Sequence, residues 1–267
     1  MPDAYANADE VATELGADSD DRGRLTMRRK LWTPSTDPGV ILCNGWSRRA
    51  YHVVGGSSLD ASTRYLAASV ARRYMTVGTH DLTFEYSAGV WADGWGNAGV
   101  LEKMAETKTW LQGSGGAKAG KISLIGISMG ATAALNYALS LGSSAKETIA
   151  SIALLSPVLD TADVAGVPRD IYLEQSLYYA FGGSESTFAV QGPAYNPQDN
   201  LSEINALKIP IHIWYSSDDP IAYHGVTEDF IESSGPYVTG TVVGAYQHSI
   251  DDFPMDAIAA WLQRRTV

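Results

Sequence analysis

Short apolar runs alternate along this chain with longer segments whose apolar residues recur at helical spacing. The runs predict strands at 25–32, 40–43, 74–82, 122–125, 149–155, 209–215 and 237–243. The periodic segments predict helices at 63–73, 97–111, 131–141, 226–233 and 255–265. Strands and helices that alternate in this way form a mostly parallel sheet with helices on both faces, so the chain is expected to be an α/β protein.

Residues 157–208 interrupt the alternation with a long, irregular and aromatic stretch that includes Tyr172, Tyr178 and Phe181. An insertion at this point lies over the carboxyl edge of the sheet, where ligands bind in such folds. We therefore expect a cap or lid at 157–208 within one α/β domain of residues 23–267.

Charge along the chain narrows the choice of partners. The net charge is −11, and seven acidic residues fall within the first 21 positions, so residues 1–22 are expected to form an acidic leader outside the domain. An acidic chain without a basic stripe argues against nucleic acid or an anionic membrane as partner. The first 21 residues have neither the basic nor the apolar region of a signal peptide, and no apolar run is long enough to span a membrane. These features predict a cytoplasmic protein.

The single cysteine, Cys43, lies inside the apolar run 40–43 and is expected to be a buried structural thiol. No cluster of Cys and His has the spacing of metal ligands. We therefore expect a function that needs neither a metal nor an organic cofactor.

The segment Gly126-Ile127-Ser128-Met129-Gly130 follows a predicted strand and precedes an Ala-rich predicted helix. This context is typical of a nucleophile elbow, a sharp strand-to-helix turn that holds the serine in a strained conformation. Side chains at the flanking positions would clash with the neighbouring strand and helix, which explains Gly126 and Gly130. Ser128 is therefore the candidate nucleophile.

A serine hydroxyl needs a base to remove its proton, usually a histidine. His248 follows the last predicted strand and precedes the last predicted helix, so it is expected at the carboxyl edge of the sheet. His80 and His212 lie within strand-like segments and are expected to pack in the core, whereas His224 is expected to begin a surface helix. His248 is the candidate base.

The acid that orients the base usually lies between nucleophile and histidine in chains with this elbow. The loop after the predicted strand 209–215 contains two neighbouring aspartates, Asp218 and Asp219, of which Asp219 is the preferred acid. Asp218 is the alternative and is expected to cap or brace the turn. A rarer arrangement would use Asp160, after the preceding strand.

Acyl transfer places negative charge on a carbonyl oxygen, which two backbone N–H groups usually stabilise. One donor is expected from Met129, the residue after the nucleophile. The other is expected from Trp46, in the loop after the strand 40–43 that begins at Asn44-Gly45.

In order and spacing, residues 25–265 resemble the α/β-hydrolase superfamily of serine hydrolases, although many members have His-Gly where this chain has Asn44-Gly45. Within it, residues 45–52 resemble a segment of the acyl-carrier-protein thioesterases, or acyltransferases, of bacterial luminescence. The shared pattern is Gly-aromatic-x-Arg-Arg followed by a histidine, here Arg48, Arg49 and His52. Those enzymes have Ala-Ser-Leu-Ser at the nucleophile, whereas this chain keeps both elbow glycines. The resemblance implies a long acyl chain as one possible substrate.

Together these residues predict a serine hydrolase that cleaves a small-molecule carboxylic ester or thioester through an acyl-enzyme. Two alternatives stay open at this point. The same three side chains serve acyltransferases and peptidases, and a chain with this fold can also be a binding protein without activity.

Overall fold

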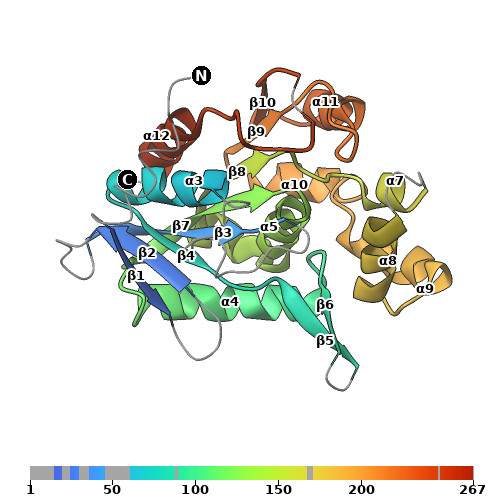
Figure 1. Ribbon diagram of the computed structural model, residues 1–267, viewed down its shortest axis with the longest axis horizontal. Helices are drawn as coiled ribbons and strands as arrows, with labels where there is room; N and C mark the ends of the chain where they lie inside the picture. Colours follow the sequence, from blue (N-terminus) through green and yellow to red (C-terminus); the bar gives the residue numbers. More distant parts are fainter. Residues whose placement is uncertain are drawn as a thin grey trace.

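The computed structural model describes residues 15–19, 25–29, 36–45, 61–87, 90–166, 171–245 and 247–266. Its main sheet has the strand order β1-β2-β4-β3-β7-β8-β9-β10 (Figure 1). These strands are β1 (Leu15–Ser19), β2 (Leu25–Arg29), β3 (Pro38–Cys43), β4 (Thr76–Thr79), β7 (Lys118–Ile127), β8 (Ile149–Leu155), β9 (Ile211–Tyr215) and β10 (Val238–Val242). From β4 to β10 neighbouring strands are parallel, and β2 joins β4 in the antiparallel direction. The predicted α/β class with a mostly parallel sheet is confirmed.

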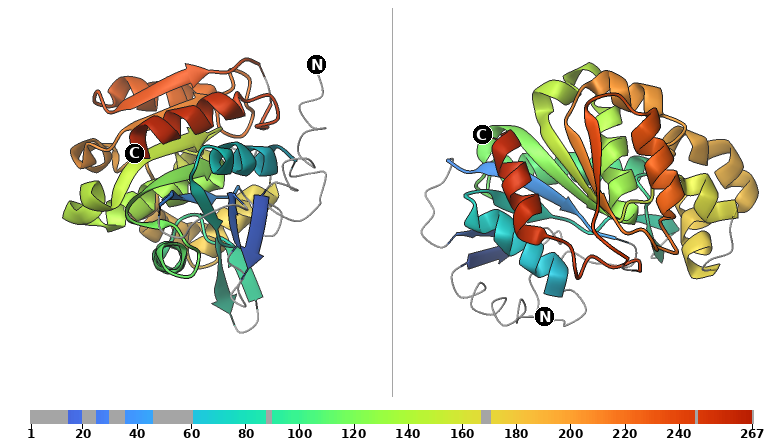
Figure 2. Two further views of the ribbon diagram at one scale, coloured as in Figure 1. Left: turned by 90° about the vertical axis from the view of Figure 1, so that its left-hand side faces the viewer. Right: turned by 90° about the horizontal axis from the view of Figure 1, so that it is seen from above.

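Helices cover both faces of the sheet. On one face, α3 and α12 pack against each other and against the sheet, while α4 and α5 contact the strands from the other face (Figures 1 and 2). Short helices α6 and η2 follow α5. The bounds are α3 (Ala61–Arg72), α4 (Ala98–Gln112), α5 (Met129–Ser140), η2 (Gly142–Ser144), α6 (Ala145–Thr148), α11 (His224–Ser233) and α12 (Met255–Thr266).

Two separate hydrophobic clusters show why the parallel strands are almost wholly apolar. Along β7, Leu124 packs in the cluster on the α4 and α5 side, and Ile125 packs in the cluster on the α3 and α12 side. Both side chains are fully buried. A strand buried on both faces reads as a continuous apolar run, so the runs at 40–43 and 122–125 identified central strands.

Three parts of the chain differ from the sequence-based expectation. Residues 15–19, inside the expected acidic leader 1–22, form β1, which pairs with β2 at the edge of the sheet. A hairpin of β5 (Thr83–Ser87) and β6 (Val90–Asp93) follows β4 and was not predicted. The stretch 157–208, expected to be irregular, folds into helices: α7 (Thr161–Gly166), α8 (Ile171–Ala180), α9 (Glu185–Gln191), η3 (Gly192–Tyr195) and α10 (Leu201–Leu207).

The helices α7, α8 and α9 lie together at one end of the molecule, on the right in Figure 1. Hydrogen bonds tie them to the rest of the fold: the Trp95 indole N–H donates to Ser176 Oγ, and Asn97 Nδ2 donates to the Ala180 carbonyl. On α5, Asn136 Nδ2 donates to the Tyr195 carbonyl. We refer to residues 157–208 as the cap segment. None of the helices in the described part of the chain combines the length and apolar character needed to cross a membrane.

Cys43 lies in β3 and is fully buried, as expected of a structural thiol. Burial raises the pKa of this thiol to about 12, because a thiolate is poorly solvated in an apolar core. We expect no alkylation of the folded protein by iodoacetamide at about pH 8, where the thiol stays protonated. Mass spectrometry before and after unfolding in urea checks this, since the unfolded chain should react. Rapid alkylation of the folded protein would contradict the assignment.

Candidate active site

Ser128 occupies the turn between β7 and α5. Its backbone has φ 52° and ψ −118°, a left-handed conformation that residues other than glycine adopt rarely. Ser128 is only 7% exposed. The Ser128 N–H donates to the Leu155 carbonyl, and the Ser128 carbonyl accepts from the Val158 N–H. These bonds to the end of β8 hold the strained turn in place, which is typical of functional sites.

The two glycines beside Ser128 allow the turn to close. A Cβ on Gly126 would lie 2.5 Å from the Ala131 Cα, and one on Gly130 would lie 2.1 Å from the Cys43 carbonyl oxygen. Both contacts are with backbone, which cannot move aside as a flexible side chain can. Each glycine is therefore required by close packing around the turn.

Replacing Gly130 with alanine is expected to destabilise the fold by about 2–3 kcal/mol or more, because the added methyl group collides with the end of β3. Thermal unfolding followed by circular dichroism measures the effect. Gly166→Ala is the matched control, since a Cβ there meets no atom of the described residues within 4 Å. Equal melting temperatures for the two variants would contradict the packing argument.

His248 meets Ser128 at the carboxyl edge of the sheet. The distance from Ser128 Oγ to His248 Nε2 is 2.7 Å, a hydrogen bond between residues 120 positions apart. His248 follows β10, and its side chain is 24% exposed. The imidazole therefore touches both the hydroxyl and solvent, as a base that must also serve a water molecule requires.

Asp219 holds the other side of the imidazole. His248 Nδ1 lies 2.9 Å from Asp219 Oδ1 and 2.8 Å from Oδ2. The carboxylate is 2% exposed and its Oδ1 also accepts from the backbone N–H groups of Ile221 and Ala222. Because an ionised carboxylate only accepts, Nδ1 carries the proton and Nε2 is left to accept from Ser128.

The two alternative acids lie elsewhere. Asp218 Oδ1 accepts from the Ser216 hydroxyl at 2.8 Å, so it braces the turn after β9. Asp160 Oδ1 accepts from the Ala162 N–H and from Asn196 Nδ2 at the start of the cap segment. Of the three candidates, Asp219 alone is hydrogen-bonded to His248 among the described contacts.

Comparisons with known proteins agree with this architecture. A family model for putative esterases matches residues 88–220, a range that includes Ser128 and Asp219. Esterase Est22 superposes with a TM-score of 0.67 at 15% identity, over 96% of this chain and 84% of that one. An S-formylglutathione hydrolase from Agrobacterium tumefaciens gives 0.67 at 13% identity, over 95% of each chain. The chain has the α/β-hydrolase fold.

A puromycin hydrolase with the same fold superposes at a TM-score of 0.67 and 16% identity over 94% of this chain, which corresponds to 38% of that longer protein. No curated protein sequence matches the chain. The likeness of residues 45–52 to acyl-carrier-protein thioesterases stays a prediction, since the matching proteins are esterases and hydrolases by name and residues 46–60 lie outside the described residues.

The α/β-hydrolase fold brings the loop after β3 beside the nucleophile. A Cβ built on Gly45 would lie 3.5 Å from the Ser128 Cβ. Asn44 Nδ2 donates to Thr79 Oγ1, whose hydroxyl donates to the Leu42 carbonyl, so β4 fixes the start of this loop. Trp46, the predicted second oxyanion donor, follows directly but lies outside the described residues.

Met129, the other predicted oxyanion donor, is the first residue of α5. The first N–H groups of an α-helix have no acceptor within the helix, and the positive end of the helix dipole favours negative charge there. The Met129 N–H thus belongs to the N-terminus of α5, directly after Ser128.

One pair near the site was not found from the sequence. Ser62, in the first turn of α3, donates a short hydrogen bond to Asp251 Oδ1 in the loop that carries His248. The partners are 189 residues apart, and neither lies in a motif. This bond fastens the loop that carries His248 to α3.

Two other histidines of the described residues, His212 and His224, have structural surroundings. His212 packs beside Trp214 and Trp261, and its two ring nitrogens lie within hydrogen-bond distance of the hydroxyls of Thr239 and Thr241. Burial lowers the pKa of His212. His224 begins α11, as predicted. Across the described ranges, no group of three or more His, Cys, Asp or Glu side chains could hold a metal ion.

Proposed function

We propose that this protein is a serine hydrolase that cleaves carboxylic esters by way of an acyl-enzyme on Ser128. The observation that carries the proposal is the unbroken hydrogen-bond chain from Ser128 Oγ through His248 to the Asp219 carboxylate. These side chains come from three different strand ends, so their meeting is not a local accident of sequence. The match to the putative esterase family supports an ester as the substrate class.

In the acylation step, Ser128 Oγ attacks the acyl carbon while His248 Nε2 takes the hydroxyl proton. The carbonyl π bond becomes a C–O⁻ single bond in the tetrahedral intermediate. When the carbonyl reforms, the bond to the leaving alkoxide breaks and His248 returns the proton to that oxygen, which departs as an alcohol. Asp219 keeps the imidazole in the productive tautomer and stabilises its charged form.

The negative oxygen of the intermediate needs backbone donors, and the proposal assigns Met129 and Trp46 to this role. Support comes from the position of Met129 at the start of α5 and from the approach of Gly45 to Ser128. Loss of one such donor typically costs about 10²–10³ in kcat.

Deacylation reverses the roles. His248 Nε2 removes a proton from a water molecule, whose oxygen attacks the acyl carbon, and the Ser128–acyl bond then breaks with return of the proton to Ser128 Oγ. The products are the carboxylic acid and the free enzyme. The reaction needs no metal or organic cofactor.

The cap segment 157–208 is proposed to cover the substrate. Its helices follow directly from β8, and the Val158 N–H bonds to the Ser128 carbonyl, so the segment begins beside the nucleophile. The same chemistry also accepts a thioester, since cleavage of an oxygen ester and of a thioester yields the same acyl-enzyme.

Rapid mixing with p-nitrophenyl esters of graded chain length tests the proposal. We expect a burst of p-nitrophenol equal to the enzyme concentration, followed by slower turnover. Matched S-acyl thioesters, followed by release of the free thiol, compare the two substrate types. Absence of turnover on every ester and thioester by folded protein would overturn the proposal.

A further inference from the structure

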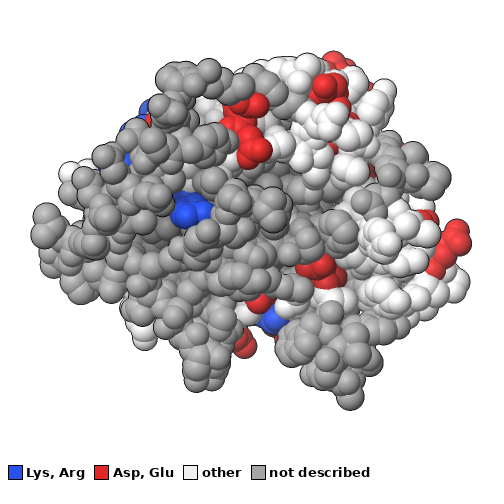
Figure 3. All heavy atoms as spheres, viewed as in Figure 1, with Lys and Arg blue, Asp and Glu red and all other residues white. Residues whose placement is uncertain are grey.

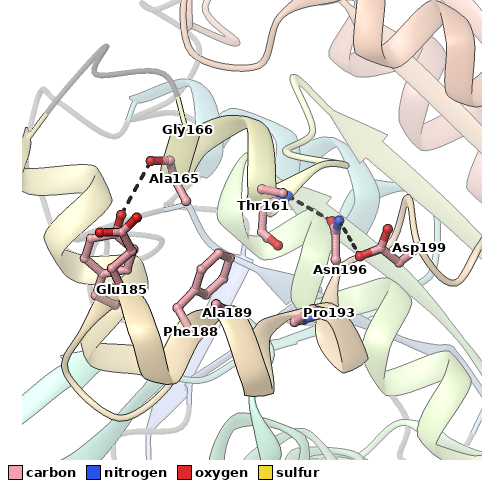
Figure 4. Close-up of a pocket in the computed structure, with 11 residues that line it drawn as sticks. Thr161, Ala165, Gly166, Glu185, Phe188, Ala189, Pro193, Asn196 and Asp199 are labelled. Atoms are coloured by element: carbon pink, nitrogen blue, oxygen red, sulfur yellow. Dashed lines mark hydrogen bonds between the residues drawn. The ribbon is translucent and has the colours of Figure 1, made fainter.

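A cavity of about 300 Å³ lies inside the cap segment, between α7, α8, α9 and the turn before α10 (Figure 4). We call it the cap cavity. Its volume is at the lower end of the range for small-molecule sites. The mechanism proposed above assigns it no role, since none of its described lining residues is one of the proposed catalytic groups.

Thr161, the first residue of α7, lines the cap cavity and is fully buried. Its hydroxyl has no hydrogen-bond partner among the described residues, and Figure 4 shows it directed toward the space between Phe188 and Asn196. A buried hydroxyl without a partner is costly, so this oxygen is a ready acceptor for a ligand that enters the cavity.

Asn196 builds one end of the cavity around that hydroxyl. It is 2% exposed; its Oδ1 accepts from the Thr161 N–H at 2.9 Å, and its Nδ2 donates to Asp160 Oδ1 and to Asp199 Oδ2. The amide is thus fully paired and fixes Thr161 and Asp199 relative to each other. This end of the cavity presents a carboxylate and a hydroxyl oxygen, held in advance of binding.

A second carboxylate stands at the opposite end, where Figure 4 places Glu185. Glu185 opens α9, whose N-cap Ser184 forms a capping box with Thr187 that fixes the start of the helix. Tyr178 also lines the cavity. Burial raises the pKa of Tyr178 to about 12, and the carboxylates of Glu174 and Glu185 add to the increase.

Between the two carboxylates the walls are apolar. Phe188 is buried and lies at the centre of Figure 4, with Ala189 and Pro193 beside it. This middle part of the cavity can therefore hold a hydrocarbon chain, and these three side chains form no hydrogen bond with it.

The charge of the cap segment points to a cationic ligand. Residues 157–208 contain seven Asp or Glu and two Lys or Arg. On the face shown in Figure 3, acidic atoms appear at the end that carries the cap helices, without a Lys or Arg atom of the described residues there. Among the described residues these carboxylates have no basic side chain on that face, and such carboxylates attract cations from solution.

We propose that the cap cavity binds a linear diammonium compound, an alkane chain with a protonated amine at each end. One ammonium group donates to Asp199 and to the Thr161 hydroxyl oxygen, and the other donates to Glu185. The chain between them packs on Phe188. This site is separate from the ester chemistry and does not depend on Ser128.

Methyl NMR of protein labelled at alanine tests the proposal, because Ala162, Ala165 and Ala189 line the cavity whereas Ala133 and Ala138 lie in the core. The probes are 1,4-diaminobutane to 1,8-diaminooctane, added to about 10 mM, where even a millimolar site is mostly occupied. Pentylamine and 1,5-pentanediol serve as controls that lack one or both charges. We expect the cavity methyls to shift with at least one diamine, at concentrations where the diol has no effect.

Variants assign the contacts. Glu185→Gln and Asp199→Asn should each lower the diamine affinity about three- to fivefold, the size of one exposed ion pair, and leave pentanediol unaffected. Thr161→Val, which keeps the shape and removes the hydroxyl, should weaken binding about fivefold. Gln191→Glu on the exposed end of α9 is a charge control that should change the affinity by less than about twofold.

No shift of the cavity methyls with any diamine would overturn the proposal, as would equal shifts with the diol. Unchanged affinity in all three variants at the cavity would also overturn it. None of these results bears on ester hydrolysis, since the binding is measured without substrate and should persist in Ser128→Ala.

Discussion

Replacing Ser128 with alanine is expected to lower kcat on a p-nitrophenyl ester by about 10⁶-fold, as happens when the nucleophile of a serine protease triad is removed. The physical reason is the 2.7 Å bond from Ser128 Oγ to His248 Nε2, since no other oxygen of the protein is hydrogen-bonded to that nitrogen among the described contacts. What activity remains would come from the oxyanion donors and from substrate binding. Turnover is followed by release of p-nitrophenol with enough enzyme to measure the residual rate.

Ser156→Ala is the matched control. Ser156 is also buried, has a positive φ of 40° and follows a strand of the same sheet, but its hydroxyl has no hydrogen-bond partner among the described residues. Its removal should leave kcat within about twofold, because no bond is lost. The double variant Ser128→Ala with His248→Ala should be no slower than either single variant, since the two residues act as a unit. Additive losses, or equal rates in Ser128→Ala and the natural protein, would contradict the mechanism.

Asparagine in place of Asp219 is expected to lower kcat by about 10⁴-fold while the protein keeps its fold. Asp219 Oδ1 accepts from the N–H groups of Ile221 and Ala222, so the oxygen of the new amide would stay there. The amide nitrogen would then replace Oδ2 and donate to His248 Nδ1, which must give up its proton. The proton moves to Nε2, and the imidazole can no longer accept from Ser128.

The neighbouring carboxylate provides the control for this substitution. Asp218→Asn should change kcat by less than about threefold, because Asp218 accepts from Ser216 at the turn and not from the imidazole. Steady-state kinetics on the two variants, with circular dichroism to verify folding, separates them. A larger loss of kcat in Asp218→Asn than in Asp219→Asn would show that Asp218, and not Asp219, is the acid.

Features that depend on neighbouring positions could be predicted from the sequence. The strand, turn and helix of the elbow at 126–130 are neighbours in the sequence, so the need for both glycines could be inferred from the sequence alone. The structure adds the distances, since a Cβ on Gly130 would collide with the backbone of Cys43. The α/β class followed in the same way, because each buried strand is a single apolar run. The positions of Asp219 and His248 were predicted from the order of strands, since each follows a strand whose carboxyl end lies at the edge that holds Ser128.

Features that depend on distant pairing could not be predicted. Residues 15–19 lie within the acidic stretch 1–21, and their place in the sheet comes from pairing with β2. The bond from Ser62 to Asp251 joins two ordinary polar residues, each of which also fits a surface loop. In the cap segment the helices are short, with seven residues in α9, so helical spacing is too brief to stand out from the sequence.

Covalent labelling with a fluorophosphonate tests the central claim, that Ser128 is the nucleophile, most directly. The reagent reacts with an activated serine and forms a stable adduct, which mass spectrometry locates on a peptide. We predict one adduct on the peptide that contains Ser128, no adduct in folded Ser128→Ala, and much slower labelling in His248→Ala. An unlabelled but folded natural protein, or an adduct on any other residue, would contradict the account.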